Sequence, residues 1–362
     1  PTAVLTQLSV VSPCFGLGVF ATAGLTWVGW RRLHLRGARS AAVAVLVTAN
    51  VLSVATVATA VNDHYAYLPT VGDLLSAADG EHNLPTWPAV AALAPAAVLR
   101  AHPRGVVVRL AVPDRGSGFG PSRALVYLPP QYFTEPGRRF GVVYLFHGSP
   151  GVPGDWFRGG GAGTTAAGLA ARGRPLIVVA PRMSHRWQDD PECVDGRTEK
   201  VETHFVRDVL PAVDGTLRTV PDRTGRTVGG MSAGGYCALN LGLRHRALIG
   251  AIIDMSGDIQ PTHTGGLAPL FGTGPAAVTL ARTNTPALYA ASVPADPPTR
   301  IWFDCGDDEL GLLPGMYRLN QVLAGRGVRA EMHVREGGHT FHVWRPALAD
   351  ALAWLTGPTG PT

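Results

Sequence analysis

The hydrophobic and polar positions divide the chain into two parts with different patterns. Near the N-terminus, residues 8–30 and 41–61 form two almost uninterrupted apolar runs. As a helix, each run is long enough to cross the ~30 Å hydrocarbon core of a bilayer. The alternatives are two buried core helices, or a signal peptide for the first run. The short basic loop that separates the runs argues against both alternatives. The pattern therefore predicts a transmembrane region over residues 1–61.

The basic loop also gives the expected orientation in the membrane. The first 62 residues contain no Asp or Glu, and their only strong charges are Arg31, Arg32, Arg36 and Arg39. Because basic loops stay in the cytoplasm, both Pro1 and everything after the second run are expected on the outer face. The chain begins with Pro rather than Met, so we expect upstream residues, with a further transmembrane helix among them. The predicted localisation is the cell membrane, multi-pass, with the rest of the chain extracytoplasmic.

From Val106 onward, short β-branched runs alternate with helical patterns, which indicates a mostly parallel sheet wrapped by helices. Eight strands are predicted, at Val106–Val112, Ala124–Leu128, Val142–Phe146, Leu176–Ala180, Thr227–Gly230, Ala251–Met255, Ile301–Cys305 and Ala330–Val334. Helices are predicted at Thr164–Arg172, Val201–Leu217, Ala233–Arg246, Met316–Arg326 and Pro346–Leu355. The predicted organisation is a catalytic α/β domain over residues 106–357 and a tail over 358–362, with a proline-interrupted juxtamembrane connector over 62–105.

Composition narrows the function classes. Of the 31 basic residues only Lys200 is Lys, and outside the Arg loop acidic and basic residues nearly balance. We read the Arg excess as coding bias and expect no nucleic-acid partner. The four cysteines have neither metal-ligand spacing nor the density of a disulfide-rich module. Cys14, Cys237 and Cys305 are interpreted as buried small hydrophobes, and Cys193 has no assigned role.

Ser232 is the predicted nucleophile. It lies in Gly230-Met231-Ser232-Ala233-Gly234, after a predicted strand and at the start of a predicted helix. Gly-x-Ser-x-Gly alone is weak evidence in so glycine-rich a chain, but the strand-turn-helix setting is what a nucleophile elbow requires. The glycines allow a sharp turn where any side chain would clash. A plain turn at a strand end is the alternative.

A serine hydroxyl needs a His base held by a carboxylate, in the chain order Ser, acid, His. His339, in a glycine-rich loop after the last predicted strand, is the first candidate for the base, and His342 is the fallback. The acid comes from the carboxylates that follow the seventh strand, where Glu309, Asp308 and Asp307 compete. For the two carboxylates that do not serve as the acid, a solvated capping turn is the alternative.

The transition state of acyl transfer needs two backbone N–H donors for its oxyanion. Ala233, the residue after the nucleophile, is the first expected donor. The second is expected from the loop after the third strand, which reads His147-Gly148-Ser149-Pro150. Pro150 has no N–H, so Gly148 or Ser149 must supply it, and Ser149 is favoured. His147 is expected to pack under the loop.

These residues together resemble the esterase D / antigen 85 mycolyltransferase branch of the α/β-hydrolases, over about 70% of the chain by family likeness. The resemblance is strongest in three motifs: His147-Gly148-Ser149, Val201-Glu202-Thr203 and Gly229-Gly230-Met231-Ser232-Ala233-Gly234-Gly235. It is completed by Trp302-Phe303-Asp304-Cys305-Gly306, leading to Glu309-Leu310-Gly311, and by the Gly338-His339 loop. It implies a Ser/Glu/His triad, with Glu309 as the acid, and no metal or organic cofactor. It also implies acyl esters of sugars or lipids as substrates.

The sequence departs from this family in two ways that bear on the substrate. Those mycolyltransferases are secreted, and they commonly have Met where this chain has Ala233. Residues 257–298, which should shape the substrate pockets, match no pattern. The prediction is a membrane-anchored serine esterase or acyltransferase of envelope lipids or sugars. A membrane-bound peptidase and a non-catalytic envelope-binding module with the same fold are the alternatives.

Overall fold

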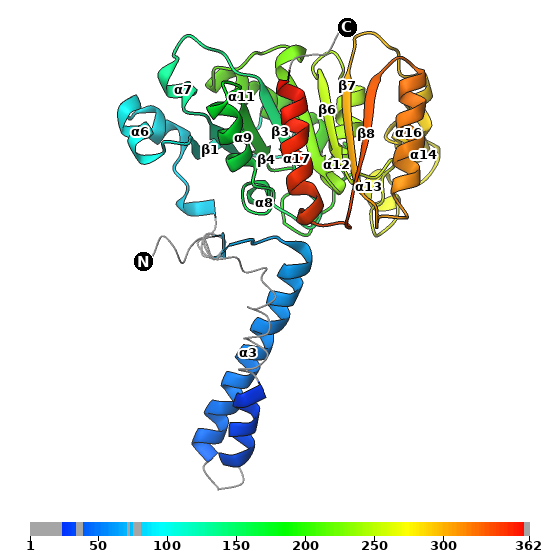
Figure 1. Ribbon diagram of the computed structural model, residues 1–362. Coiled ribbons are helices and arrows are strands. Elements are labelled where there is room, and N and C mark those ends of the chain that lie inside the picture. Colours follow the sequence, from blue (N-terminus) through cyan, green and yellow to red (C-terminus); the bar gives the residue numbers. More distant parts are fainter. Residues whose placement is uncertain (1–23, 34–38, 71–72, 75–80, 358–362) are drawn as a thin grey trace. The chain divides into compact units, whose positions relative to one another are not determined.

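The computed structural model describes residues 24–33, 39–70, 73–74 and 81–357. The chain divides into two compact units, Pro1–Asn83 and Leu84–Thr362, and each is described by itself. Figure 1 shows the elements of both units.

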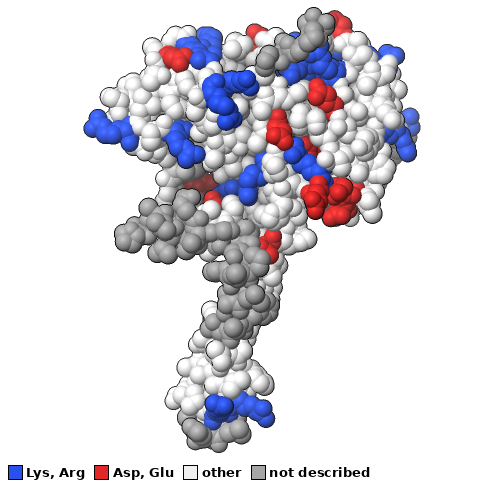
Figure 2. Space-filling view, viewed as in Figure 1, with Lys and Arg blue, Asp and Glu red and all other residues white. Residues whose placement is uncertain are grey.

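The first unit contains the long helix α3 (Arg39–Tyr65). Its segment Val43–Tyr65 is the one helix in the described residues that is long and apolar enough to cross a membrane. Apolar side chains on α3 are exposed, among them Val51 at 62% and Val54 at 70%. In Figure 2 the described surface of this unit is mostly uncharged, and basic side chains gather at one end of it.

Five polar side chains in the middle of α3 bond within the helix. The side chains of Thr48, Asn50, Ser53, Thr56 and Thr59 each donate to the carbonyl four residues earlier, at 2.7–3.0 Å. A helix in hydrocarbon must satisfy its polar groups internally, and such back-bonding does so. The first predicted span is described only in part, because residues 24–33 are helical and residues 8–23 lie outside the described residues. The prediction of a multi-pass chain is therefore supported only to the extent of one apolar helix.

The second unit is built on one eight-stranded sheet, in the order β1-β2-β4-β3-β5-β6-β7-β8. β1 and β2 are antiparallel to their neighbours, and every later pair is parallel. The strands are β1 (Val106–Val112), β2 (Ser122–Leu128), β3 (Val142–Phe146), β4 (Ile177–Pro181), β5 (Arg226–Met231), β6 (Ala251–Met255), β7 (Arg300–Gly306) and β8 (Arg329–Arg335). This confirms the prediction of a mostly parallel eight-stranded α/β-hydrolase sheet.

Helices cover both faces of the sheet, because every residue of β3, β4, β5 and β6 is buried. α9 and α17 pack side by side on one face (Figure 1). The longer helices and those next to the site are α9 (Ala162–Ala171), α10 (Val201–His204), α11 (Leu210–Thr216), α12 (Ala233–Arg244), α16 (Leu313–Gly325) and α17 (Phe341–Thr356). Shorter helices are α5 (Trp87–Ala91), α6 (Pro95–Ala101), α7 (Gln131–Thr134), α8 (Gly154–Phe157), α13 (Ala268–Phe271), α14 (Pro275–Thr283) and α15 (Pro286–Tyr289).

The predicted helices differ from the observed ones by up to three residues at their ends, except for two that differ more, in both cases at a proline. The helix predicted over 201–217 contains a π-helical turn at Phe205–Val209. It precedes Pro211, whose missing N–H cannot continue the regular ladder. The helix predicted to start at Pro346 begins earlier, at Phe341, and Pro346 lies inside it.

The cysteine interpretation needs a correction. Cys237 is fully buried, as expected, but it forms a disulfide with Cys193, with 5.2 Å between the two Cα atoms. The partners are 44 residues apart, so their spacing gave no signal. Cys305 is a buried free cysteine, as expected. Cys14 lies outside the described residues.

Candidate active site

The turn between β5 and α12 holds Ser232 in a strained conformation, with φ 57° and ψ −128°. Residues with a Cβ rarely adopt such a positive φ, and they persist there only where the surrounding structure fixes them. The Ser232 N–H donates to Met255 O at 2.9 Å, and Gly235 N–H donates back to Ser232 O at 2.8 Å. The turn thus exposes the hydroxyl at the carboxyl edge of the sheet.

The two flanking glycines of this turn are required by close packing. A Cβ on Gly230 would lie 1.9 Å from Gly234 O, and a Cβ on Gly234 would lie 2.1 Å from Phe146 O. Neither acceptor can move without breaking the backbone of β3 or α12. The elbow therefore has its Gly-x-Ser-x-Gly sequence for steric reasons.

The loop between β8 and α17 brings His339 to the nucleophile. Its Nε2 lies 2.8 Å from Ser232 Oγ, and its Nδ1 lies 2.6 Å from Glu309 Oε2. The His339 side chain is 46% exposed, whereas that of Glu309 is only 6% exposed. His342, the fallback base, lies exposed in the first turn of α17. The structure thus places His339 between Ser232 and Glu309 within hydrogen-bonding distance of both.

Of the three competing carboxylates, only Glu309 contacts the imidazole. Asp307 and Asp308 are exposed and hold the histidine loop by other contacts. Asp307 Oδ1 accepts from Gly337 N–H at 2.9 Å, and Asp308 N–H donates to Gly337 O at 3.1 Å. Burial acts to raise the pKa of Glu309, but hydrogen bonds from His339 and Ser256 outweigh it and lower that pKa below its usual value. Glu309 is therefore ionised when it faces a protonated imidazole.

Ser256 and Trp344 belong to this arrangement, although no sequence motif pointed to them. Ser256 Oγ donates to Glu309 Oε1 at 2.6 Å and accepts from Trp344 Nε1 at 3.0 Å. The Trp344 ring also meets the His339 ring edge-on, with 4.8 Å between centroids. Ser256 directly follows β6, which pairs with both β5 and β7. That strand order was the one signal that could have placed it near the acid.

Among the backbone N–H groups near Ser232, those of Gly148, Ser149 and Ala233 have no acceptor in the described residues. A Cβ on Gly148 would lie 3.4 Å from Ser232 Cβ, so this loop passes directly beside the nucleophile. Ser149 precedes a cis peptide bond to Pro150. Open donors beside a nucleophile are what an oxyanion hole needs.

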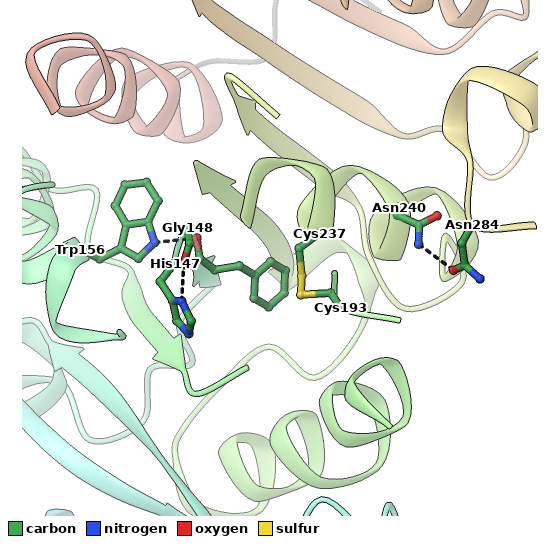
Figure 3. Close-up of a disulfide and its surroundings, with 8 residues drawn as sticks. His147, Gly148, Trp156, Cys193, Cys237, Asn240 and Asn284 are labelled. Atoms are coloured by element: carbon green, nitrogen blue, oxygen red, sulfur yellow. Dashed lines mark hydrogen bonds between the residues drawn. A yellow bond between two sulfur atoms is a disulfide. The ribbon is translucent and has the colours of Figure 1, made fainter. Parts of the chain in front are cut away.

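Buried polar contacts support the loop that contains Gly148 and Ser149 (Figure 3). Trp156 Nε1 donates to Phe146 O at 2.9 Å. His147 is buried, with its Nδ1 2.9 Å from Gly148 O, in agreement with its expected packing role.

A small cavity lies beside the elbow, and a larger one adjoins that cavity at residues 189–191. The smaller, of about 20 Å³, is lined by Gly148, Ser149 and Ala233 together with residues 189–193. Burial and the nearby Asp190 raise the pKa of Glu192 in its wall to about 8. The larger cavity, of about 380 Å³, shares residues 189–191 with the smaller and is mostly polar. Among the described residues, no cluster of His, Cys, Asp and Glu could hold a metal ion.

A second Ser-His-Asp arrangement lies elsewhere, between β2 and α10. His204 Nε2 lies 3.1 Å from Ser122 Oγ, and His204 Nδ1 lies 2.7 Å from Asp208 Oδ2. The side chains of His204 and Asp208 are fully buried, and the Phe119 ring stacks on the imidazole at 4.0 Å. Burial lowers the pKa of His204 more than Asp208 raises it. No substrate can reach this histidine, so the arrangement joins elements of the fold.

Comparison with known proteins places most of the chain in one group. A family model described as "Putative esterase" matches residues 120–355. An uncharacterized protein of Corynebacterium glutamicum is 30% identical over 249 residues, which are 67% of this chain and 58% of that protein. Esterase Rv1288 of Mycobacterium tuberculosis is 29% identical over 60% of this chain and 52% of its own length. The chain thus spans little more than half the length of either relative.

Solved structures share the fold. A ferulic acid esterase is 25% identical with a TM-score of 0.59, and the match covers 70% of this chain and 97% of that one. Mycobacterium tuberculosis MPT51 is 18% identical with a TM-score of 0.52, over 69% of this chain and 98% of that one. The second likeness is evidence of fold alone.

Proposed function

The chain belongs to the esterase family, and from this premise we propose that it is a carboxylic ester hydrolase whose catalytic triad is Ser232, His339 and Glu309. The observation that carries the proposal is the continuous hydrogen-bonded chain from Ser232 Oγ through His339 to Glu309. Nucleophile, base and acid follow one another in the order typical of this fold.

The reaction proceeds through an acyl-enzyme. Ser232 Oγ attacks the ester carbonyl carbon while its proton passes to His339 Nε2, and Glu309 stabilises the imidazolium through Nδ1. The N–H groups of Ala233 and Ser149 bind the oxyanion. As the intermediate collapses, the bond to the alcohol oxygen breaks and His339 returns the proton to that oxygen. Water, or a second alcohol, then attacks the acyl-enzyme by the reverse sequence.

We further propose that the enzyme is anchored in the cell membrane by two or more helices, with the catalytic unit extracytoplasmic. The apolar helix α3, its internally bonded polar side chains and the basic residues before it support the anchor. The Cys193–Cys237 disulfide supports an oxidising compartment. Acyl esters of envelope lipids or sugars are the proposed substrates, consistent with likeness to a ferulic acid esterase.

Replacing the nucleophile tests the triad. Ser232→Ala is expected to lower kcat for p-nitrophenyl acetate by on the order of 10⁶, because the triad residues act as one unit. Fluorophosphonate labelling of the wild type, located by mass spectrometry, should fall on Ser232. Unchanged hydrolysis by the variant would overturn the assignment. Product analysis with and without an added sugar then separates hydrolysis from acyl transfer.

A further inference from the structure

Residues 182–200, which join β4 to α10, form a long connection next to the proposed site. They contain no helix or strand, apart from an isolated bridge between Asp195 and Lys200. Connections of this length without regular structure are uncommon in compact domains and often have a function. Since the connection has no backbone ladder of its own, contacts with its surroundings must hold it in place.

One set of contacts joins this connection to the oxyanion loop. Gly151 N–H donates to Trp187 O at 2.9 Å, and Ser149 Oγ donates to Asp189 O at 3.3 Å. Ser149 is the proposed second oxyanion donor. A shift of residues 187–189 would therefore be transmitted directly to the residue whose N–H must face the oxyanion.

A second set of contacts joins the connection to the insertion between β6 and β7. Thr262 N–H donates to Glu192 Oε1 at 2.7 Å, and Arg197 N–H donates to Leu270 O at 2.8 Å. Val194 packs in a small apolar cluster with Leu270, Phe271 and Ala277. The insertion therefore supports the connection through contacts separate from those with the oxyanion loop.

The disulfide fixes the same connection to the nucleophile helix. Cys237 lies on α12, five residues after Ser232, and Figure 3 shows the disulfide in the region of His147 and Gly148. Glu192 and Cys193 both have positive φ, 52° and 47°. Two successive residues in this sparsely populated region need external restraint to stay there, and the covalent bond to α12 supplies it.

We propose that the Cys193–Cys237 disulfide is a positioning element of the reaction: it holds residues 187–193 against the oxyanion loop and so keeps the Ser149 N–H directed at the substrate carbonyl. This inference rests on the proposed function of Ser232 and Ser149. Cleavage by a dithiol breaks the S–S bond and leaves two thiols, while the dithiol is oxidised to its cyclic disulfide. Reduction of the folded enzyme should therefore lower turnover reversibly.

The test compares turnover per active site with the disulfide closed and open. The full chain in detergent micelles is reduced with dithiothreitol, and thiols are counted to establish cleavage. Active sites are titrated with a fluorophosphonate, and kcat and KM are measured with p-nitrophenyl acetate while circular dichroism monitors the fold. We expect kcat per labelled site to fall about tenfold, part of the 10²–10³ that one oxyanion donor contributes, with KM little changed. Reoxidation should restore kcat.

Two variants separate positioning from stability. Cys193→Ala/Cys237→Ala should resemble the reduced wild type and no longer respond to dithiothreitol, which also controls for Cys14 and Cys305. Ser149→Ala keeps both the disulfide and the N–H but removes the bond to Asp189 O; it should lower kcat several-fold at an unchanged melting temperature.

The outcomes are distinct for the two proposals. Unchanged kcat per labelled site after reduction, or in Ser149→Ala, would overturn the positioning role, even if the melting temperature of the reduced protein falls. If reduction unfolds the protein, unchanged kcat in Ser149→Ala still overturns the positioning role, because the restraint is proposed to act through the Ser149–Asp189 bond. Failure of the oxidised enzyme to label at Ser232 would instead overturn the proposed function.

Discussion

At the scale of single residues, Glu309, the proposed acid, is the site residue whose orientation is fixed most strongly by its neighbours. Glu309 Oε1 accepts from Ser256 Oγ and from Gly306 N–H, which leaves Oε2 for His339. A carboxylate fixed on one oxygen presents the other in a single direction, which orients the imidazole toward Ser232. Among the described residues, no N–H or O–H donates to the carboxylate of Asp308, one residue earlier in the chain.

The choice of acid can be tested with matched substitutions. Glu309→Gln should lower kcat by roughly 10³ to 10⁴, because a neutral amide neither stabilises the imidazolium nor selects the correct tautomer. Asp308→Asn, also a single charge removal at an adjacent position, should stay within about threefold of wild type. Steady-state kinetics with p-nitrophenyl acetate measures both. Equal losses in the two variants would argue against Glu309 as the specific partner of His339.

The proposed site residues were predictable from the sequence where their order along the chain determines their place in the fold. Ser232, Glu309 and His339 follow the fifth, seventh and eighth strands, so parallel pairing brings all three to one edge of the sheet. Ser256 and Cys193 were not predictable as site residues. Ser256 acts through a contact with Glu309, 53 residues away, and Cys193 bonds with Cys237, 44 residues away. Neither contact leaves a local pattern in the sequence.

At the scale of elements, the elbow depends on two backbones that pass close together. Gly234 is where the start of α12 meets the end of β3, with space for no side chain. The alternation of β-branched runs with helical patterns along the sequence predicted these strands and α12 well. Short buried β-branched runs between turns are compatible with few structures other than strands. The short helices of the 257–298 insertion had no comparable signal, since four-residue helices such as α13 and α15 take their shape from neighbouring segments.

Two glycine substitutions, one in the elbow and one in an exposed helix, test the packing of the elbow. Gly234→Ala should destabilise the catalytic unit by more than about 3 kcal/mol, because the new Cβ would overlap the Phe146 carbonyl. Gly215→Ala is the control: Gly215 is exposed in α11 with no atom within 4 Å of its added Cβ. It should be neutral or stabilising by about 0.5 kcal/mol. Urea unfolding measures both, and a mild effect of Gly234→Ala would contradict the steric account.

At the scale of the whole molecule, the chain has a helical unit with exposed apolar side chains and a separate catalytic unit with its own core. The proposed triad, the proposed oxyanion donors and the disulfide all belong to the second unit. Nothing in the proposed chemistry draws on residues before Leu84. The first unit is therefore expected to determine where the enzyme acts and not how fast it turns over small esters.

Truncation before Leu84 tests this division. Residues 84–362 alone should be soluble without detergent and should keep kcat/KM for p-nitrophenyl acetate within about twofold of the full chain, because all proposed catalytic contacts remain. The full chain should sediment with membranes through carbonate washing. Sedimentation of the truncated protein with membranes, or a large loss of its activity, would contradict the division.

The placement of His339 also has a consequence for the timing of synthesis. Ser232 and His339 are separated by 107 residues. At about 5–20 residues per second, the histidine is added roughly 5 to 20 s after the serine. During that interval the nascent protein carries a serine without its base and cannot hydrolyse the esters of the cell that makes it. Activity is therefore expected only after β8 has been added to the sheet and α17 has packed on it.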